Sequence, residues 1–342
     1  MKHKLIFILL PVSLLAQAAL FNTGFEEADW RTLWNDYDNN PAGSNDLIAD
    51  PGPFNTPGNH VMRLRSPAGA RGGADLVKVL SSTYTRVYAR WYQKWETGYN
   101  FSAGCHNGGL HAGNRNYLGS SDNRPTGSDW FSAWLEPCGE NRFHFYAYYR
   151  GMFMDCANPV GSCWGDHLPC MIGSGYCTKP VYNAPPMPLP PAPVAGQWYC
   201  IEIMADAGVA TTDTSSVRPQ GILNFWVDGV EYGPFENLWL RTSDAIKIGI
   251  LYLSLFNHDN THSTEGIMVD EVAVSTNYIG PKAGVERHSP ELLSPAALGG
   301  KAAVYDLRGR KMQSLEGLPN GLYFIRLPGT NSPVTIKRVV LK

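Results

Sequence analysis

The sequence predicts an all-β protein, built as a two-sheet sandwich with a small C-terminal β domain. At least eight stretches of the 342-residue chain alternate apolar and polar residues, and none shows helical periodicity. The chain is rich in glycine (35), proline (25), tyrosine (17) and tryptophan (10), whereas charged residues make up only 17%. This composition is typical of β-structure with many loops. The length allows one large β domain or two domains.

The N-terminus has the pattern of a secretory signal peptide. A Lys-His-Lys segment at 2–4 precedes an apolar run over 5–15, and the small residues of 16–18 follow it. The run is too short to span a bilayer, so we expect residues 1–18 to be removed on export. No later stretch of the sequence is apolar over a sufficient length, and we expect no insertion into a membrane.

The charge and the cysteine content indicate the class of partner and the compartment. The formal net charge is −2 and no basic run is present, so we expect no nucleic-acid partner. Seven cysteines suit an oxidising compartment. Four of them recur every seven residues in the segment 151–196, where we expect a disulfide-stapled loop with three possible pairings. These four are Cys156, Cys163, Cys170 and Cys177. Cys105, Cys138 and Cys200 are left over, and Cys200 is expected to be buried in an apolar strand.

Alternation places the main strands between residues 60 and 275. They are expected over 60–66, 86–95, 129–137, 143–150, 197–206, 221–233 (two strands around an Asp-Gly turn), 245–259 and 266–275. A short turn joins 129–137 to 143–150 as an antiparallel hairpin. The segment 35–57, rich in Asn, Asp, Gly and Pro, is expected to be a loop. The proline tract 183–196 cannot join a sheet ladder.

The composition of the sequence changes near residue 280. We assign 19–280 to the sandwich domain, with 151–196 as an insertion, 281–300 to a linker and 301–342 to the C-terminal domain. The pieces VYDLRGR (304–310), LPNGLYFIR (318–326) and IKRVVLK (336–342) resemble the C-terminal sorting domain of the bacterial type IX secretion system. The resemblance implies a sorting signal that engages the type IX secretion machinery and has no catalytic role. The protein is then expected to cross the periplasm and to be secreted or attached to the cell surface.

Two predicted strands carry rows of basic and phenolic side chains. In 143–150 the residues Phe143, Phe145, Ala147 and Tyr149 share the apolar face. The opposite face holds His144, Tyr146, Tyr148 and Arg150. In 86–95 the corresponding row is Tyr88, Arg90, Tyr92 and Lys94. We expect both rows to line one concave face, with His106 and His111 at its rim. The alternative is that both rows are ordinary solvated strand faces, and that His144 is a structural residue hydrogen-bonded within its sheet.

The order of motifs resembles that of the concanavalin A-like jelly-roll polysaccharide lyases that act on alginate and glucuronan. The matching pieces are 88–95, 106–113, 130–137 with 143–150, 196–203, 221–229, 250–258 and 269–275. The resemblance implies a concanavalin A-like jelly-roll sandwich and cleavage of a uronate-containing polysaccharide by β-elimination. Tyr146 and Tyr148 match the tyrosines of the family's YAY-type strand and would be base and acid. His106 stands near a position where the family often has Lys, and Trp134 stands where Arg is common.

Elimination from a uronate needs a group that neutralises the carboxylate, a base for the C5 proton and an acid for the leaving O4. No cofactor is required for this chemistry. The expected catalytic residues are Tyr146, Tyr148, His144 and His106. The expected substrate-binding residues are Arg90, Lys94, Tyr88, Tyr92, Arg150, His111, Trp134 and Trp130.

Three other functions stay open from the sequence. A non-catalytic carbohydrate-binding or adhesive protein would use the same aromatic residues as a stacking platform. A glycoside hydrolase needs two carboxylates facing across a cleft, and Glu136 is the only acid on a central predicted strand. A metal site formed by His106, His111 and His144 is the third alternative.

The first and last strands of the sandwich supply a further candidate site. Such strands often lie side by side in jelly rolls, which would bring Glu26 or Glu27 close to Asp270. Carboxylate oxygens are ligands that Ca²⁺ prefers. We therefore expect a structural calcium site at Glu26 and Asp270, with ordinary surface acids as the alternative.

Overall fold

The computed structural model describes residues 19–39, 42–66, 72–101, 105–120, 123–138, 141–153, 164–170, 182–257 and 264–282, and three short strands between 303 and 326. The chain divides into two units, 1–286 and 287–342. The expected signal peptide at 1–18 lies outside the described residues. So do Cys156, Cys163 and Cys177, most of the linker, and the C-terminal piece 336–342.

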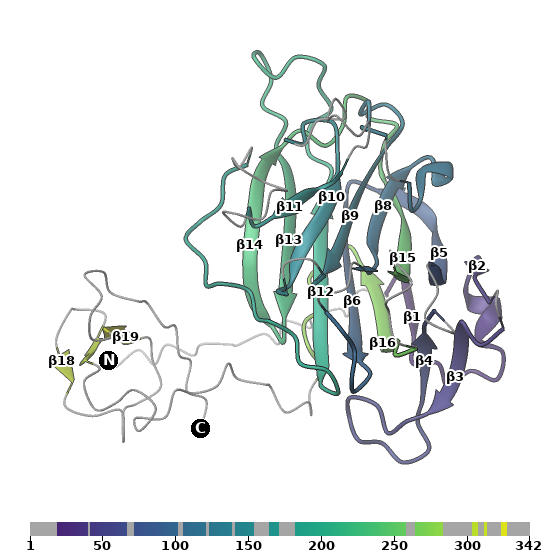
Figure 1. The fold of residues 1–342 in the computed structure, drawn as a ribbon. Helices are drawn as coiled ribbons and strands as arrows, with labels where there is room; N and C mark the ends of the chain where they lie inside the picture. Colours follow the sequence, from purple (N-terminus) through teal and green to yellow (C-terminus); the bar gives the residue numbers. More distant parts are fainter. Residues whose placement is uncertain are drawn as a thin grey trace, which may run out of the picture. The chain divides into compact units, whose positions relative to one another are not determined.

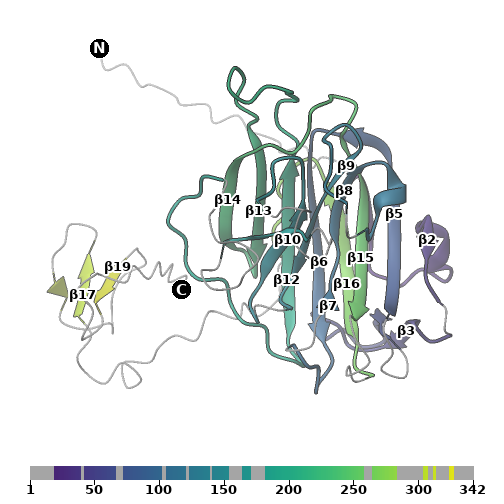
Figure 2. The ribbon, with the colours of Figure 1, turned by 45° about the horizontal axis from the view of Figure 1, so that its top comes forward.

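The first unit is a sandwich of two antiparallel sheets, as the sequence predicts (Figures 1 and 2). The first sheet has the order β14-β13-β12-β6-β16-β4-β3, and β1 also pairs with β16. Its strands are β1 (Phe21–Thr23), β3 (Asn45–Ala49), β4 (His60–Leu64), β6 (Arg86–Trp95), β12 (Trp198–Asp206), β13 (Gly221–Val227), β14 (Val230–Leu238) and β16 (Ile267–Ser275).

The second sheet has the order β11-β10-β9-β8-β15-β5-β2, and β7 also pairs with β15. Its strands are β2 (Asp36–Tyr37), β5 (Gly72–Tyr84), β7 (Cys105–His106), β8 (Gly109–Gly113), β9 (Trp130–Glu136), β10 (His144–Tyr148), β11 (Asp166–Leu168) and β15 (Ile248–Asn257). Two short 3₁₀ helices, Trp30–Leu33 and Arg115–Tyr117, accompany the sheets. In the described part of the chain, no helix is long and apolar enough to cross a membrane.

The core lies between the two sheets, where the apolar halves of the alternating strands meet. Phe145 of β10 contacts Phe225 of β13 edge to face, with 5.4 Å between ring centroids. Phe143 meets Trp95 of β6 in the same way at 5.6 Å. These contacts fix the inner face of each strand, and residues of the opposite parity therefore point away from the core.

All eight predicted ranges contain strands, and the hairpin of β9 with β10 is antiparallel as expected. The longest strand, β5 over Gly72–Tyr84, was not predicted. The expectation of a continuous loop over 35–57 is wrong, because β2 and β3 lie within it. Both are short strands at sheet edges, where few side chains need to be apolar. The proline tract 183–196 forms one isolated antiparallel bridge, between Asn183 and Glu236 of β14, and its other residues belong to no strand.

The second unit contains a three-stranded antiparallel sheet with the order β18-β17-β19. Its strands are β17 (Ala303–Asp306), β18 (Lys311–Met312) and β19 (Tyr323–Arg326). Strand β17 overlaps the predicted piece 304–310, β18 directly follows that piece, and β19 lies within 318–326, so this region holds a small β module.

Candidate functional site

The outer face of the second sheet gathers the polar and aromatic side chains that the sequence places on alternate positions. Because Phe145 points into the core, His144, Tyr146 and Tyr148 point away from it. In the antiparallel register these three lie opposite Glu136, Trp134 and Ser132 of β9. We call His106, Glu136, His144, Tyr146, Tyr148 and His167 the histidine–tyrosine cluster.

Glu136 lies at the centre of this cluster. Its Oε2 atom is 2.9 Å from Nδ1 of His106 and accepts a longer hydrogen bond of 3.4 Å from the backbone N–H of Asn107. Its Oε1 atom is 4.0 Å from Nε2 of His144. Burial opposes the ionisation of Glu136, but His106, together with His144 and His167, outweighs it and holds the pKa of the carboxyl below its usual value. Glu136 is therefore a buried carboxylate surrounded by imidazoles.

The two tyrosines form a hydrogen-bonded pair beside this carboxylate. The hydroxyl groups of Tyr146 and Tyr148 are 2.9 Å apart, and the ring of His106 stacks on Tyr146 at 4.6 Å between centroids with 13° between planes. Burial, with Tyr148 adding, raises the pKa of Tyr146 well above its usual value. At neutral pH Tyr146 is thus a phenol, suited to donate a proton rather than to accept one.

Gly165 packs directly against the phenol pair. A Cβ atom at this position would lie 3.1 Å from ring carbons of both Tyr146 and Tyr148 and 3.0 Å from the carbonyl oxygen of Ala147. Its backbone N–H donates a hydrogen bond to Tyr146. The absence of a side chain therefore lets the chain approach the cluster closely here.

A histidine that the sequence analysis did not single out completes the cluster. His167 of β11 lies opposite Tyr146 in the register and 4.3 Å from His144, measured between ring centroids. It belongs to the insertion 151–196, where the cysteine spacing predicted a stapled loop rather than a strand of the sheet. The three-residue strand β11 is too short to show alternation by itself.

Cys105 and Cys138 form a disulfide, so neither is a leftover thiol. Cys105 precedes His106, and Cys138 lies two residues after Glu136. The bond therefore ties β7 to the end of β9 at the pair of residues that form the centre of the cluster. Cys200 is a free, buried cysteine, as expected, and burial raises the pKa of its thiol to about 12. Cys170 is disulfide-bonded.

Removing this disulfide is expected to destabilise the protein and to loosen the His106–Glu136 contact. The two cysteines are 33 residues apart, and closing a loop of that size stabilises the folded protein by about 2–4 kcal/mol, because it lowers the entropy of the unfolded chain. The double variant Cys105→Ser, Cys138→Ser should show this loss in equilibrium urea unfolding. Cys200→Ser serves as the single-thiol control outside the cluster. An equal loss of unfolding free energy in Cys200→Ser and in the double variant would contradict a specific stabilising role of the Cys105–Cys138 disulfide.

The second predicted row does not belong to this face. Tyr88, Arg90, Tyr92 and Lys94 lie on β6, in the first sheet, on the side turned away from the core. The expectation that both rows line one concave face is wrong, because strand alternation gives the side of a strand but not the sheet that it joins. Arg90 donates to the carbonyl oxygens of Gly280 and Glu271, and the hydroxyl of Tyr92 accepts from the backbone N–H of Lys282.

Arg150 also departs from its predicted row. Strand β10 ends at Tyr148, and the Arg150 guanidinium lies over the ring of Trp239, 4.7 Å from its centroid. The expectation that Arg150 continues the face of His144 and Tyr146 is therefore wrong. None of the cationic residues predicted to bind a carboxylate, namely Arg90, Lys94 and Arg150, has a described contact with the histidine–tyrosine cluster.

The remaining predicted residues do lie on the outer face of the second sheet, but they are buried. Trp134 contacts Tyr146, Tyr148 and Tyr252, with centroid distances between 5.9 and 6.3 Å. Trp130 stacks on His111 at 5.8 Å. Burial lowers the pKa of His111 to about 4, so this ring is neutral at physiological pH. Its Nε2 atom is engaged with the carbonyl oxygen of Asn114 at 3.1 Å.

The chain is similar to several solved structures at low sequence identity. No family model matches the chain, and no curated protein matches its sequence. The chain is similar in fold to jelly-roll lyases. Alginate lyase vAL-1 from Chlorella virus is 12% identical over 71% of this chain and 93% of its own, with a TM-score of 0.49. The endo-β-1,4-glucuronan lyase from the fungus Trichoderma reesei is 15% identical over 76% and 96%, with a TM-score of 0.45. The metal-free carbohydrate recognition domain of Emp46p is 11% identical over 76% and 97%, with a TM-score of 0.40.

A two-sheet sandwich does not by itself determine the chemistry, because one fold can carry unrelated functions. The choice depends on the residues of the site. Two further regions of the first unit also hold charged side chains.

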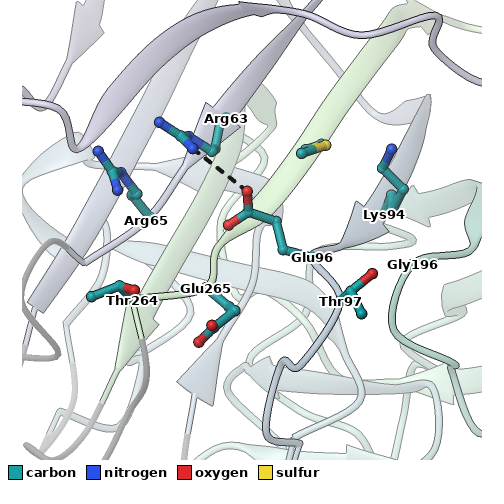
Figure 3. Close-up of a pocket in the computed structure, with 9 residues that line it drawn as sticks. Arg63, Arg65, Lys94, Glu96, Thr97, Gly196, Thr264 and Glu265 are labelled. Atoms are coloured by element: carbon teal, nitrogen blue, oxygen red, sulfur yellow. Dashed lines mark ion pairs between the residues drawn. The ribbon is translucent and has the colours of Figure 1, made fainter.

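The first is a pocket of about 420 Å³ on the first sheet (Figure 3). It is lined by Arg63, Arg65, Lys94, Glu96, Thr97, Gly196, Thr264, Glu265 and Met268. Each cation already has an acidic partner: Arg63 pairs with Asp46 and Glu96, Arg65 with Asp46, and Lys94 with Asp50. The pocket therefore offers little uncompensated positive charge to an acidic sugar, although it contains the predicted residue Lys94.

The second is the pair of acids Asp75 and Glu136 on the second sheet. Asp75 was not singled out from the sequence, because β5 was not recognised as a strand. Asp75 accepts hydrogen bonds from Tyr252 and Ser254, at 2.8 and 2.7 Å. It lies three strands from Glu136, in the order β9-β8-β15-β5, which is about 14 Å at the usual strand spacing. Paired carboxylates of glycoside hydrolases are at most about 9.5 Å apart. The geometry of these two acids is therefore wrong for hydrolysis.

The expected calcium residues lie where the first and last strands meet. Strand β1 pairs with β16, so the predicted adjacency is confirmed. Asp270 is buried and accepts hydrogen bonds from Asn59 Nδ2 at 3.1 Å and from the backbone N–H of Glu271 at 2.7 Å. Glu26 accepts a hydrogen bond of 2.7 Å from the backbone N–H of His60. The negative charge of Glu26 helps to raise the pKa of Asp270, so the two carboxylates repel each other, and a bound cation would relieve this repulsion.

The stability of the sandwich is expected to fall as the pH rises through the titration range of Asp270. Burial, with the charges of Glu271 and Glu26 adding, raises the pKa of Asp270 to about 7, above the unfolded value of 3.8. The folded state therefore binds this proton more tightly. The stability that protonated Asp270 contributes is fully present below the unfolded pKa and is lost as the pH rises from 3.8 to about 7. Its size is on the order of 4 kcal/mol.

Urea unfolding at several pH values in the presence of a chelator tests this expectation. Between about pH 5 and pH 8 the wild type should lose stability relative to Asp270→Asn, which cannot ionise. Parallel pH profiles for the two proteins would contradict the shifted pKa.

Proposed function

We propose that the jelly-roll unit is a polysaccharide lyase that cleaves a uronate-containing glycan by β-elimination. The observation that carries the proposal is the pair of contacts around His106. Its Nδ1 atom is 2.9 Å from the buried carboxylate of Glu136, and its ring stacks on Tyr146, whose hydroxyl is hydrogen-bonded to that of Tyr148. A base and a proton donor therefore stand side by side.

The roles follow from the hydrogen bonds. Because Glu136 is ionised, it accepts the Nδ1–H of His106, which leaves Nε2 as the atom that takes the C5 proton of the uronate. The phenol of Tyr146 donates its proton to O4 as the C4–O4 bond breaks and the C4–C5 double bond forms. Tyr148 holds the Tyr146 hydroxyl in place. His106 rather than a tyrosine is thus the base, which reassigns the roles that the family resemblance implies.

The burial of the cluster determines how a glycan reaches it. His106 is the most accessible member, with 19% of its side chain exposed, whereas the tyrosines are buried. The sugar therefore approaches from the side of His106. The backbone at Gly165, which packs against Tyr146, has to move before O4 can meet the phenol.

Incubation of the full chain with alginate, glucuronan, pectin, xylan and cellulose tests the proposal. Elimination creates an unsaturated sugar that absorbs in the ultraviolet, and this absorbance should grow on a uronate polymer. New reducing ends without absorbance would instead indicate a hydrolase. Binding to a polysaccharide without any product would indicate the carbohydrate-binding alternative. Either of these two outcomes would overturn the lyase proposal.

We also propose that the C-terminal β module is a type IX sorting domain and that the protein is secreted or displayed on the cell surface. The support is the resemblance of 304–310 and 318–326 to that domain and the presence of β17, β18 and β19 in this region. The signal-like segment 1–18 is consistent with the same route. Deleting 301–342 should leave the chain in the periplasm of a host that has this secretion system.

We also propose a structural calcium ion at Glu26 and Asp270, because the strands beside them pair and the charge of Glu26 acts on Asp270. An ion that binds only the folded state raises its stability by mass action. Adding calcium above the pH at which Asp270 ionises should therefore raise the melting temperature, and a chelator should lower it. Asp270→Asn should respond to neither. If neither calcium nor the chelator changes the melting temperature of the wild type, the proposed calcium site is wrong.

A further inference from the structure

We infer that Glu136, His144 and His167 form a binding site for a divalent transition-metal ion of the zinc class. Each of these residues offers one ligand atom, and the three atoms lie within 4.8 Å of one another. Among the described residues, this is the set of three acidic, histidine or cysteine side chains that lies close enough to share a metal ion. Two imidazoles and one carboxylate are a set that zinc binds in enzymes, with a further position left open.

The hydrogen bond of His144 orients its other nitrogen toward the site. Nδ1 of His144 is 2.8 Å from the backbone carbonyl oxygen of Arg142. A carbonyl oxygen can only accept, so Nδ1 carries the proton and a neutral His144 presents the lone pair of Nε2. That atom is 4.0 Å from Oε1 of Glu136. A second-shell carbonyl that fixes the tautomer in this way is a regular feature of metal-bound histidines.

The two oxygens of Glu136 divide between two tasks. Oε2 faces His106 at 2.9 Å, whereas Oε1 faces His144. The carboxylate can therefore bind a metal through Oε1 and still orient His106 through Oε2. Bonds of about 2.0–2.1 Å in a tetrahedral site place ligand atoms about 3.3 Å apart, so Oε1 and Nε2 would have to approach by less than about 1 Å.

The charge balance also favours a cation at this position. At most 3% of each ligand residue is exposed, so the carboxyl group of Glu136 is buried beside the two imidazoles. A dication leaves the site with a net positive charge. If the proposed lyase function holds, this charge would neutralise the uronate carboxylate, a task for which no described cation contacts the cluster.

The arrangement replaces the three-histidine site considered from the sequence. Of the three residues His106, His111 and His144, only His144 is a ligand. His111 turns toward Trp130 and Asn114, and His106 lies on the far side of Glu136. The ligand that the sequence could not supply is His167.

Metal content after dialysis against zinc tests the inference directly. The full chain should retain about one zinc per molecule, and its cobalt form should show the intense visible absorption of a four-coordinate site. His144→Ala and His167→Gln should each lose most of this binding. His60→Ala, which removes an exposed histidine on the first sheet, is the matched control and should keep it. Circular dichroism shows whether each variant is folded.

The outcomes separate this inference from the proposed lyase function. Stoichiometric zinc without any polysaccharide cleavage would support the metal site while the lyase proposal fails. Absence of zinc and cobalt binding by the folded wild type would overturn the site, whatever its activity. Loss of binding in His60→Ala but not in a folded His167→Gln would overturn it as well, because the metal would then sit on the surface.

Discussion

Replacing Tyr146 by phenylalanine is expected to slow β-elimination by about 10²–10⁴-fold, the usual effect of losing a positioned proton donor. The substitution removes the hydroxyl that lies 2.9 Å from Tyr148 and keeps the ring on which His106 stacks. One buried hydrogen bond is worth about 1 kcal/mol, so the fold should survive. The initial rate of ultraviolet-absorbing product measures the effect, with circular dichroism as the check on folding.

Tyr149→Phe is the matched control. This neighbouring tyrosine is also buried, but its hydroxyl donates to Asp166 on the core side, away from His106. Its loss should cost stability and leave the rate of elimination within a few-fold of the wild type. Equal rates for the wild type and Tyr146→Phe would refute the role of Tyr146.

Replacing Phe145 by alanine is expected to destabilise the sandwich by about 3–5 kcal/mol, the range for truncating a buried phenylalanine. Phe145 is fully buried and contacts Phe225 and Phe235 of the opposite sheet. The loss combines the transfer of the ring to water with the cavity left between the sheets. Chemical unfolding gives its size.

Leu189→Ala provides the comparison, since 61% of Leu189 is exposed, and its stability should stay within about 0.5 kcal/mol of the wild type. Phe145 and Tyr146 are adjacent in sequence but face opposite sides of β10. The two substitutions should therefore separate cleanly, one affecting stability and the other turnover. A small stability change in Phe145→Ala would mean that the strand faces are assigned the wrong way round.

The sequence could reveal which side of a strand each residue takes, because the period of two is a local property of the backbone. The apolar face of 143–150 and the outward row of 86–95 were both predicted correctly as faces of strands. Which strands become neighbours is a long-range property. Arg90 and Tyr146 therefore looked like members of one site, although their strands belong to different sheets.

The same limit explains the residues that were missed. His167 lies in a strand of three residues within a segment whose cysteine and proline content predicted a loop. Asp75 lies on β5, which was not recognised as a strand. The Cys105–Cys138 bond joins residues that only the pairing of β7, β8, β9 and β15 brings together. In each case the missing information is a contact between distant segments.

The mass of the cleavage products tests the central proposal most directly. Elimination adds no water, so the masses of the fragments should sum to that of the parent oligouronate, and one fragment should carry the unsaturated sugar. Hydrolysis adds one water for each bond cleaved. We predict fragments without added water from the wild type and almost none from Tyr146→Phe. Fragments that each account for an added water would contradict the lyase assignment.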